Sequence, residues 1–472
     1  MARLNGGGGG GPIAITDTFV VNSQVQMLAL TAQTGDVAVR TDSSETYILQ
    51  GTDPTVLGDW VQLLFPSGLG GTGAAGQIGV FSGASFVQGY ADFKWDNTNH
   101  NFIAGTGSLS GVGVFKTILG QGNTDASDGY NIMGGKSTSI PALNEGFNII
   151  VGDTHTIAGA GAGFSGVFGG GNTVSLKYNL VGGNGQSITG GWALAGGLSN
   201  TVSGSHGTVG GKSNTITANF ATAFGEGNSV SGIAWGFAAG HNNTVGYVAG
   251  AIGNVNNATG VESFAAGYSN TASGAESIAL GAQNTASNTH AVALCWANVA
   301  SGLHSLATGE GSRASDRASS SFGRYANARM PATMSLQGYF TGSTGDHQTS
   351  VTPLFISTPD ATPLEMKITE IPEFLSTLDG RAYLCRLSVV ARNGALATET
   401  AGYTLDFVFD RGAGVGTCRI SGITKNVVHE DVAAWDVTVT ADLVNGRPAV
   451  TVTGEVAKTI RWSGRMEMTE VA

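Results

Sequence analysis

Apolar, polar and glycine positions repeat every fourteen residues through the middle of the chain. One glycine, here called the marker, opens each repeat, and cysteine replaces it once. The markers are Gly169, Gly183, Gly197, Gly211, Gly225, Gly240, Gly253, Gly267, Gly281, Cys295, Gly309 and Gly323. One step of fifteen and one of thirteen cancel, and looser copies begin at Gly135 and Gly152. Self-similarity at a short period predicts a solenoid of stacked turns.

Each repeat carries the same residue types at fixed distances from its marker. The fifth residue after the marker is small and apolar, so we expect it to point inward. It changes from valine or isoleucine to alanine near residue 250, where we expect the interior to change. The third residue is usually asparagine, which tolerates turn conformations and can bond the same amide one turn away. We expect an asparagine ladder that includes Asn200, Asn214, Asn228, Asn243, Asn270 and Asn284.

Fourteen residues accommodate two short strands and two turns, so the repeat predicts a parallel β-roll. Such a roll is thin. The two or three inward side chains of each turn recover only part of the conformational entropy lost when that turn is ordered. Three rolls packed side by side would supply the missing burial, so we expect a homotrimer.

The segment "SNTASGAESIALGAQNTASNTHAVAL", residues 269–294, resembles the head repeats of trimeric bacterial surface adhesins, the YadA-like heads. The resemblance covers roughly residues 120–328 and implies a left-handed parallel β-roll in a homotrimer. The predicted fold class is therefore all-β. Those adhesins carry a long secretion signal and a membrane-anchor barrel, and we recognise neither in this sequence. We therefore expect synthesis in a host cytoplasm.

The sequence predicts four segments. Residues 1–66 hold a glycine-rich leash and a small β module for attachment, and residues 67–118 form a glycine-rich β connector. Residues 119–328 form the roll, and residues 329–472 form a C-terminal antiparallel β-sandwich. The stretch "GDVAVRTD…TYILQGTDPTVLGDWVQL" resembles an N-terminal module of predicted bacteriophage tail-fibre proteins, which implies attachment to a tail or baseplate protein. The glycine run can equally be a simple disordered terminus.

Residues beyond the repeat alternate like strands. A hairpin is expected at Asn445-Gly446, because this dipeptide favours tight β turns. The expected strands are Thr333–Tyr339, Thr352–Ile356, Leu364–Ile368, Ala382–Ala391, Tyr403–Phe409, Thr417–Ile423, Trp435–Leu443, Ala449–Val452 and Lys458–Arg465. About nine strands without helical periodicity predict a sandwich that caps the roll.

Composition narrows the function. The chain has 33 acidic against 22 basic residues and no basic run, so we expect no nucleic-acid partner. No apolar stretch approaches the roughly 18 residues of a membrane helix, so we expect no membrane insertion. The cysteines Cys295, Cys385 and Cys418 have no metal-ligand spacing and are expected to be reduced. We expect no cofactor and no metal.

Candidate chemistry is sparse. The ninth residues after successive markers include Glu262, Glu276, His290 and His304, which could hold a cation, form a trimer contact or, more remotely, perform acid–base catalysis. They could equally form an exposed ladder in which Glu276 meets His290, and this interpretation is favoured because a roll offers no cleft. The group His429, Glu430 and Asp431 is expected to be a solvated turn. No known catalytic motif is present, so we expect no enzyme.

Surface residues suggest two kinds of contact. Trp192, Trp235 and Trp296 can stack on sugars, although packing at a subunit contact is the favoured interpretation. Receptor contacts are expected in two C-terminal loops, because loops vary while their scaffold holds. The candidates are Asp346, His347 and Gln348 in the turn Thr341–Ser350, and Asp410 and Arg411 in the loop Asp410–Gly416.

The leading hypothesis is a virion protein: a homotrimeric bacteriophage tail fibre that is attached by its N-terminus. Its distal end would recognise a host-surface glycan or outer-membrane protein. The alternatives are a bacterial trimeric surface adhesin, a polysaccharide depolymerase and an ice-binding solenoid. The depolymerase is disfavoured because no acidic cluster is evident. The ice-binding solenoid is disfavoured because only one threonine column runs along the roll.

Overall fold

The computed structural model describes residues 16–63, 77–81, 87–96, 99–106, 108–110, 115–142, 146–161, 163–338, 344–395 and 399–471. The chain divides into two compact units, Met1–Gly105 and Thr106–Ala472. The glycine leash lies outside the described residues, as does Thr341–Ser343 of the predicted receptor turn. No helix in the described part of the chain is long and apolar enough to span a membrane.

The N-terminal unit begins with a small four-stranded sheet. Its strands are β1 (Thr18–Val21), β2 (Val37–Arg40), β3 (Glu45–Leu49) and β4 (Trp60–Leu63), in that order, with α1 (Gln24–Leu28) and the short 3-10 helix η1 (Leu57–Asp59) between them. β2 and β3 form an antiparallel hairpin. The sheet and helix enclose Met27, Leu49 and Trp60. An antiparallel meander of β5 (Gln77–Phe81), β6 (Val87–Asp96) and β7 (Asn101–Ala104) follows.

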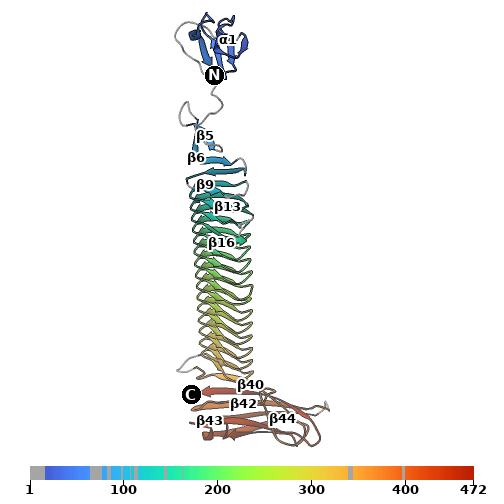
Figure 1. The fold of residues 1–472 in the computed structure, drawn as a ribbon. Helices are drawn as coiled ribbons and strands as arrows, with labels where there is room; N and C mark the ends of the chain where they lie inside the picture. Colours follow the sequence, from blue (N-terminus) through green and yellow to red (C-terminus); the bar gives the residue numbers. More distant parts are fainter. Residues whose placement is uncertain are drawn as a thin grey trace. The chain divides into compact units, whose positions relative to one another are not determined.

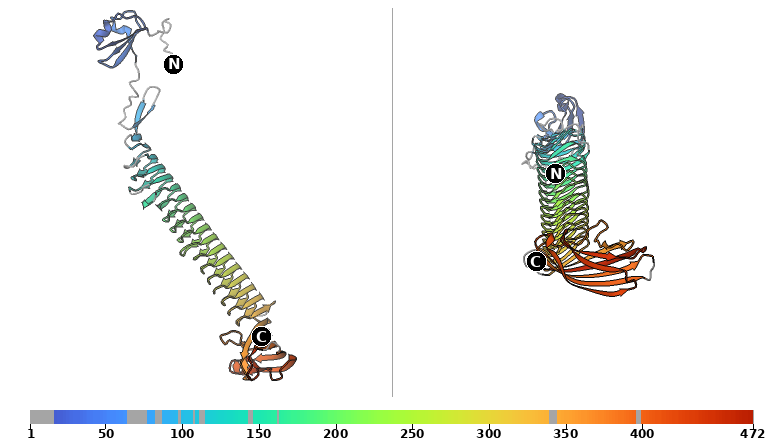
Figure 2. Two further views of the ribbon diagram at one scale, coloured as in Figure 1. Left: turned by 90° about the vertical axis from the view of Figure 1, so that its right-hand side faces the viewer. Right: turned by 90° about the horizontal axis from the view of Figure 1, so that it is seen from below.

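The second unit begins with the β-roll, in which a long and a short strand alternate and each stacks in parallel on its counterpart one turn away (Figures 1 and 2). The long strands are β9 (Thr117–Gln121), β11 (Tyr130–Lys136), β13 (Phe147–Asp153), β15 (Gly166–Gly170), β17 (Leu180–Asn184), β19 (Leu194–Leu198), β21 (Thr208–Lys212), β23 (Thr222–Glu226), β25 (Phe237–His241), β27 (Gly250–Asn254), β29 (Phe264–Tyr268), β31 (Ile278–Ala282), β33 (Val292–Trp296), β35 (Leu306–Glu310), β37 (Ser320–Arg324) and β39 (Met334–Gln337). The short strands are β8 (Leu109–Ser110), β10 (Thr124–Asp125), β12 (Ser139–Ile140), β14 (Thr156–Gly161), β16 (Thr173–Leu176), β18 (Ser187–Ile188), β20 (Thr201–Val202), β22 (Thr215–Ile216), β24 (Ser229–Val230), β26 (Thr244–Val245), β28 (Asn257–Ala258), β30 (Thr271–Ala272), β32 (Thr285–Ala286), β34 (Val299–Ala300), β36 (Arg313–Ala314) and β38 (Asn327–Ala328). The predicted parallel β-roll is therefore confirmed.

The marker glycines occupy a position that a side chain would block. Gly197 has φ of 112°, and a Cβ added there would lie 1.9 Å from the carbonyl oxygen of Gly211 in the next turn. The same close approach recurs along the marker column, which explains why glycine keeps this position in almost every repeat. Cys295, with φ of 83°, is the exception to this glycine column.

The interior of the roll is narrow. The fifth residue after each marker is fully buried, from Val174 to Ala328, as predicted. A second buried column lies two residues before each marker. It also changes from mostly valine to alanine, but earlier, after Val209. The predicted change near residue 250 is therefore seen in the first column, between Val245 and Ala258, whereas the second column has already changed by Ala223.

The sandwich grows directly out of the roll, because β39 pairs on one side with β37 of the roll and on the other with β40 (Thr349–Thr358). The predicted strand Thr333–Tyr339 therefore contains the last long strand of the roll. The larger sheet contains β40, β47 (Ile460–Val471), β42 (Arg381–Asn393), β43 (Thr400–Arg411) and β44 (Cys418–Glu430), in that order, all antiparallel.

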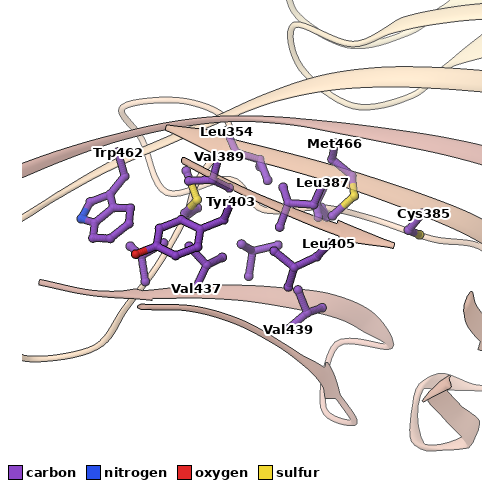
Figure 3. Close-up of a cluster of buried hydrophobic side chains, with 14 of the residues drawn as sticks. Leu354, Cys385, Leu387, Val389, Tyr403, Leu405, Val437, Val439, Trp462 and Met466 are labelled. Atoms are coloured by element: carbon purple, nitrogen blue, oxygen red, sulfur yellow. The ribbon is translucent and has the colours of Figure 1, made fainter. Parts of the chain in front are cut away.

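A smaller antiparallel sheet of β41 (Leu364–Glu365), β46 (Arg447–Thr453) and β45 (Asp436–Asp442) faces the larger one. The side chains between the sheets include Leu387, Tyr403, Val437 and Trp462, all buried (Figure 3). The hairpin at Asn445-Gly446 is present between β45 and β46. The predicted sandwich is confirmed, because each expected strand from Thr352 onward overlaps an observed strand.

Candidate functional site

The asparagine column forms a continuous ladder inside the roll. Asn270 is fully buried, and its side-chain amide nitrogen donates to Asn256 Oδ1 at 2.9 Å, to the Ala266 carbonyl at 2.9 Å and to the Gly281 carbonyl at 2.7 Å. Its Oδ1 accepts from the backbone nitrogen of Asn284 at 3.0 Å. Each amide thus ties together neighbouring turns. The members Asn200, Asn214, Asn228, Asn243, Asn270 and Asn284 are all buried.

His155 takes the place of asparagine in one early turn. Its ring is buried, with Nε2 3.2 Å from the Val151 carbonyl, while Nδ1 accepts from the Asn172 backbone nitrogen at 3.2 Å. These partners fit the neutral imidazole, in which Nε2 carries the proton. Burial lowers the pKa of His155 below its ordinary value of 6.5. Sequence analysis did not single out this residue, although its column position was visible.

An aromatic stack follows the corner of the roll, five residues before each marker from Gly169 to Gly240. Tyr178 and Trp192 have ring centroids 4.1 Å apart, and Phe220 and Trp235 lie 4.8 Å apart with planes 10° from parallel. Each residue has a left-handed backbone, with φ near 60°, so the corner aims every ring in the same direction. The complete stack is Phe164, Tyr178, Trp192, His206, Phe220 and Trp235.

The stack distinguishes sugar binding from packing at a subunit contact for Trp192. Trp192 has Tyr178 on one face and His206 on the other, so neither face is open to a sugar. The edge of the Trp192 ring faces the solvent, and the residue is 57% exposed in the single chain. Trp296 lies elsewhere, on the outer side of β33, and donates from Nε1 to Gln283 Oε1 at 3.2 Å. The geometry at Trp192 therefore favours packing against a protein surface.

The same corner column turns charged after residue 248. His290 Nε2 lies 3.0 Å from Glu276 Oε2, and the rings of His290 and His304 stack at 4.7 Å. The predicted ladder in which Glu276 meets His290 is therefore present. Among the described residues, no group of three or more His, Cys, Asp or Glu side chains could hold a metal ion.

An apolar strip runs beside the aromatic stack. We define the strip as the corner residues together with the residues two positions later, which begin each long strand. Trp192 and Leu194, and Trp235 and Phe237, are such pairs, and all four side chains are exposed in the single chain. These exposed apolar side chains, separated by turns that carry Thr208 and Thr222, indicate an interaction surface.

The predicted receptor turn instead closes the end of the roll. Gln348 Oε1 accepts from the Asn327 backbone nitrogen at 2.8 Å, and Gln348 Nε2 donates to the Asn327 carbonyl at 3.1 Å. The Gln348 side chain thus makes the hydrogen bonds to β38, the last short strand, that a further turn of the roll would otherwise make. Asp346 is buried as well and forms an ion pair with Arg381 at 2.8 Å.

The prediction of receptor contacts is wrong for Gln348 and Asp346, because both side chains are buried in this closure. Arg381 also pairs with the buried carboxylate of Glu470, so the network holds the roll to the sandwich. Only His347 of the three candidates is exposed. The repeat pattern shows where the roll ends. It does not show which residues form hydrogen bonds with the backbone N–H and C=O groups of its last turn.

Of the two candidate residues in the second predicted loop, Arg411 is mostly buried and Asp410 is accessible. Arg411 Nε lies 2.6 Å from Asp379 Oδ1, and an NH group donates to the Thr377 carbonyl at 2.7 Å. Its role as a receptor contact is therefore not supported, because the guanidinium is already occupied. Asp410 is partly exposed and pairs with Arg419 at 2.9 Å. Asp410 and His347 keep the accessibility that a contact needs.

Other candidates have structural partners. Glu430 accepts from the Tyr403 hydroxyl at 2.6 Å, and Asp431 accepts from the Thr400 backbone nitrogen at 2.7 Å, so this turn anchors one end of the sandwich. All three cysteines are free thiols, as expected. Burial raises the pKa of the Cys385 thiol to about 12, which keeps it protonated.

A buried charge closes the other end of the roll, and sequence analysis missed it. Lys116 and Asp125 are fully buried, with Lys116 Nζ 3.3 Å from Asp125 Oδ1. The ammonium also donates to the Asp125 and Ser127 carbonyls. A single lysine without a repeat partner carries no pattern that could have revealed this role.

The two parallel ladders define the protein as a β-solenoid, a fibrous repeat protein. Two copies of the YadA head domain repeat match the chain, at residues 258–284 and 272–294. No curated protein matches the sequence. Residues 258–294 are therefore similar to YadA head repeats, and the β-solenoid around them fits a shaft of such repeats, as in an adhesin-like fibrous protein.

Proposed function

We propose that the protein is the tail fibre of a bacteriophage. It acts as a homotrimer whose N-terminal unit attaches to a tail or baseplate protein and whose C-terminal sandwich recognises a receptor on the host cell. The observation that carries the fibre assignment is the stack of YadA-like repeats that continues into a folded sandwich. The resemblance of the N-terminal module supports the phage origin. The protein would be made in the host cytoplasm and reside in the virion.

The apolar strip supports the trimer. Trp192, Leu194, Trp235 and Phe237 remain exposed in one chain although their neighbours inside the roll are fully covered. The interior offers mainly alanine, valine and asparagine, so little further burial is available within one roll. Packing the strips of three chains together would remove these side chains from water and add about 1.5–3 kcal/mol for each large side chain buried.

Charge placed in the strip tests the trimer. The wild type should have a mass in solution of three chains of 47.7 kDa each, measured by light scattering. The double substitution Leu194→Asp and Phe237→Asp should shift it toward the single-chain mass. Ser203→Asp and Ser287→Asp, which add the same charge at exposed polar positions of the roll, should leave the trimer intact. A stable wild-type monomer would contradict the proposal.

A bacterial trimeric surface adhesin is the second candidate, and the YadA head repeat matches favour it. The two proposals differ in where the mature protein is found. Peptides of this chain in purified virions, detected by mass spectrometry, would support the tail fibre. Peptides confined to the envelope of the producing cells would support the adhesin and contradict the tail fibre.

A further inference from the structure

The larger sheet of the sandwich has one face without a covering layer among the described residues. Its inner side chains, such as Tyr403 and Trp462, contact the smaller sheet, while alternate residues point away from that core. We call this second side the outer face. It includes Val390 of β42 and Ser463 of β47, which are exposed and occupy paired positions.

Three arginines on the outer face form no ion pair with a carboxylate of the described residues. Of the eight arginines between residues 344 and 471, five form ion pairs in the described structure. The remaining three are Arg392, Arg461 and Arg465, and all are exposed. They lie on two adjacent strands, in a chain whose formal net charge is −11. These three guanidinium groups are therefore not held in ion pairs by the described acidic residues, although Glu467 lies two positions beyond Arg465 on β47.

Strand register brings two of these arginines together. Arg461 of β47 pairs directly with Arg392 of β42, and Ser357 of β40 lies on its other side. Like charges in directly opposed positions destabilise a sheet. An anion bound between them would remove that cost, and guanidinium groups bind carboxylates through two parallel hydrogen bonds. Arg465 points to the same side about 13 Å further along the strand.

The outer face is also hollowed around these residues. A hollow of about 630 Å³ is lined by Phe355, Ser357, Lys367, Glu370 and Arg461, among others. A second, of about 160 Å³, shares Arg461 and includes Arg392. A third, of about 440 Å³, is lined by Val390, Ser463 and Arg465, among others.

The lining of the largest hollow combines charge with an aromatic ring. Lys367 Nζ lies 5.4 Å from the centroid of the Phe355 ring and donates to the Glu370 carbonyl at 2.9 Å. Ser357 adds an exposed hydroxyl group. The Glu370 carboxylate is the acidic group in this hollow and would favour a ligand that keeps its own charge near Arg461. Hydroxyl, aromatic and cationic groups together suit a charged sugar.

We propose that the outer face binds an acidic polysaccharide whose carboxylates lie between Arg392 and Arg461 and near Arg465. The spacing along β47 favours a chain with repeated charges over a single small anion. The inference deepens the proposed function, because it names the class of receptor that the sandwich would recognise. Three copies in a trimer would add avidity if their spacing fits the polymer.

Titration calorimetry on the full-length protein tests the inference. The probes are a hexamer of galacturonic acid, maltohexaose as the neutral control and a phosphorylated mannan oligosaccharide. The wild type should bind the galacturonate hexamer and not maltohexaose. The double variant Arg392→Gln and Arg461→Gln should lose at least tenfold in affinity. The matched variant Arg386→Gln and Arg419→Gln removes two exposed, ion-paired arginines of the same sheet and should change affinity less than twofold.

Several outcomes would overturn the inference. These are no binding of the galacturonate hexamer, an equal loss in the matched variant, or binding of the phosphorylated probe alone. A change in oligomeric mass of the Arg392/Arg461 variant would show that the face is a subunit contact instead. Host-cell binding separates the inference from the proposed function. If the Arg392/Arg461 variant binds cells as well as wild type does, the polysaccharide site on the outer face is not the receptor site, and the tail-fibre proposal is unaffected. If wild type binds the hexamer but no cells, the polysaccharide site is supported and host recognition by the fibre is contradicted.

Discussion

The roll and the sandwich bury their side chains in opposite ways. Most turns of the roll enclose a few small residues and one asparagine, such as Ala279, Ala286 and Asn284, and repeat this arrangement many times. The sandwich encloses large residues that each occur once, including Trp435, Tyr403 and Trp462. The roll therefore gains stability from the agreement of neighbouring turns, and the sandwich from the fit of individual side chains.

The two modes of burial make the two regions vulnerable to different substitutions. A repeat protein is stabilised by interfaces between neighbouring repeats, so damage in one turn weakens its two neighbours first. A sandwich core is a single packed unit, so a cavity anywhere lowers the stability of the whole. Substitutions can test whether the ladder, the marker glycine and the aromatic core have these separate roles.

The largest effect is expected in the ladder. Replacing Asn270 and Asn284 together with leucine removes the amide bonds to three turns and leaves buried carbonyls such as that of Gly281 without a donor. Each unsatisfied buried group costs about 1–3 kcal/mol, and forcing leucine into the narrow interior adds about 1–3 kcal/mol. The melting temperature of the roll should fall clearly. An unchanged melting temperature would show that the ladder contributes nothing to stability.

A cavity in the sandwich should come next. Trp462→Ala removes a fully enclosed ring that donates to Thr358 Oγ1 at 3.0 Å, and should destabilise the sandwich by about 3–5 kcal/mol. Trp296→Ala, at an exposed site on the roll, is the control and should cost about 1 kcal/mol or less. Hydrogen exchange can locate the loss. In the Trp462 variant, amide exchange should speed up mainly in the sandwich. A larger increase in the roll than in the sandwich would contradict the idea that the two regions are stabilised separately.

The marker position is tested by two adjacent glycines. Gly197→Ala places a methyl group 1.9 Å from the Gly211 carbonyl oxygen and forces alanine into a φ of 112°, which should cost about 2–3 kcal/mol locally. Gly196→Ala meets nothing within 4 Å and should be close to neutral. Thermal unfolding of the pair measures the difference, and equal melting temperatures would refute the explanation of the glycine column.

The smallest effect is a dependence on pH. His155 is buried as a neutral ring, and burial holds its pKa below 6.5 in the folded state. Above pH 6.5 the ring is neutral in both states and the folded state keeps its full stability. Below pH 6.5 the unfolded chain binds a proton that the folded chain does not, so stability should fall by up to about 1.4 kcal/mol per pH unit.

His155→Asn restores the residue type of the column and removes this titration. The variant should lose less stability than wild type as the pH falls from 6.5 to 5, measured by denaturant unfolding. Parallel curves for the two proteins would mean that His155 is not the group responsible.

The period of fourteen was enough to predict the roll, its inward columns and its asparagine ladder, because a stacked turn puts every copy of a residue in one environment. The charged end of the corner column was also readable, since Glu276 and His290 follow each other at the same offset. Alternation and turn residues likewise located the sandwich strands. These features depend on local pattern, which a single sequence contains.

The roles of residues that occur once depend on contacts between distant parts of the chain. Gln348 and Asp346 were expected at the surface, but they close the roll, because its last turn leaves backbone groups that need a partner. Lys116 does the same at the opposite end. The pairing of Arg392 with Arg461 depends on the register of strands almost seventy residues apart, which local pattern does not specify. Repetition thus made the shaft predictable from sequence, whereas its ends and the binding face depend on long-range contacts.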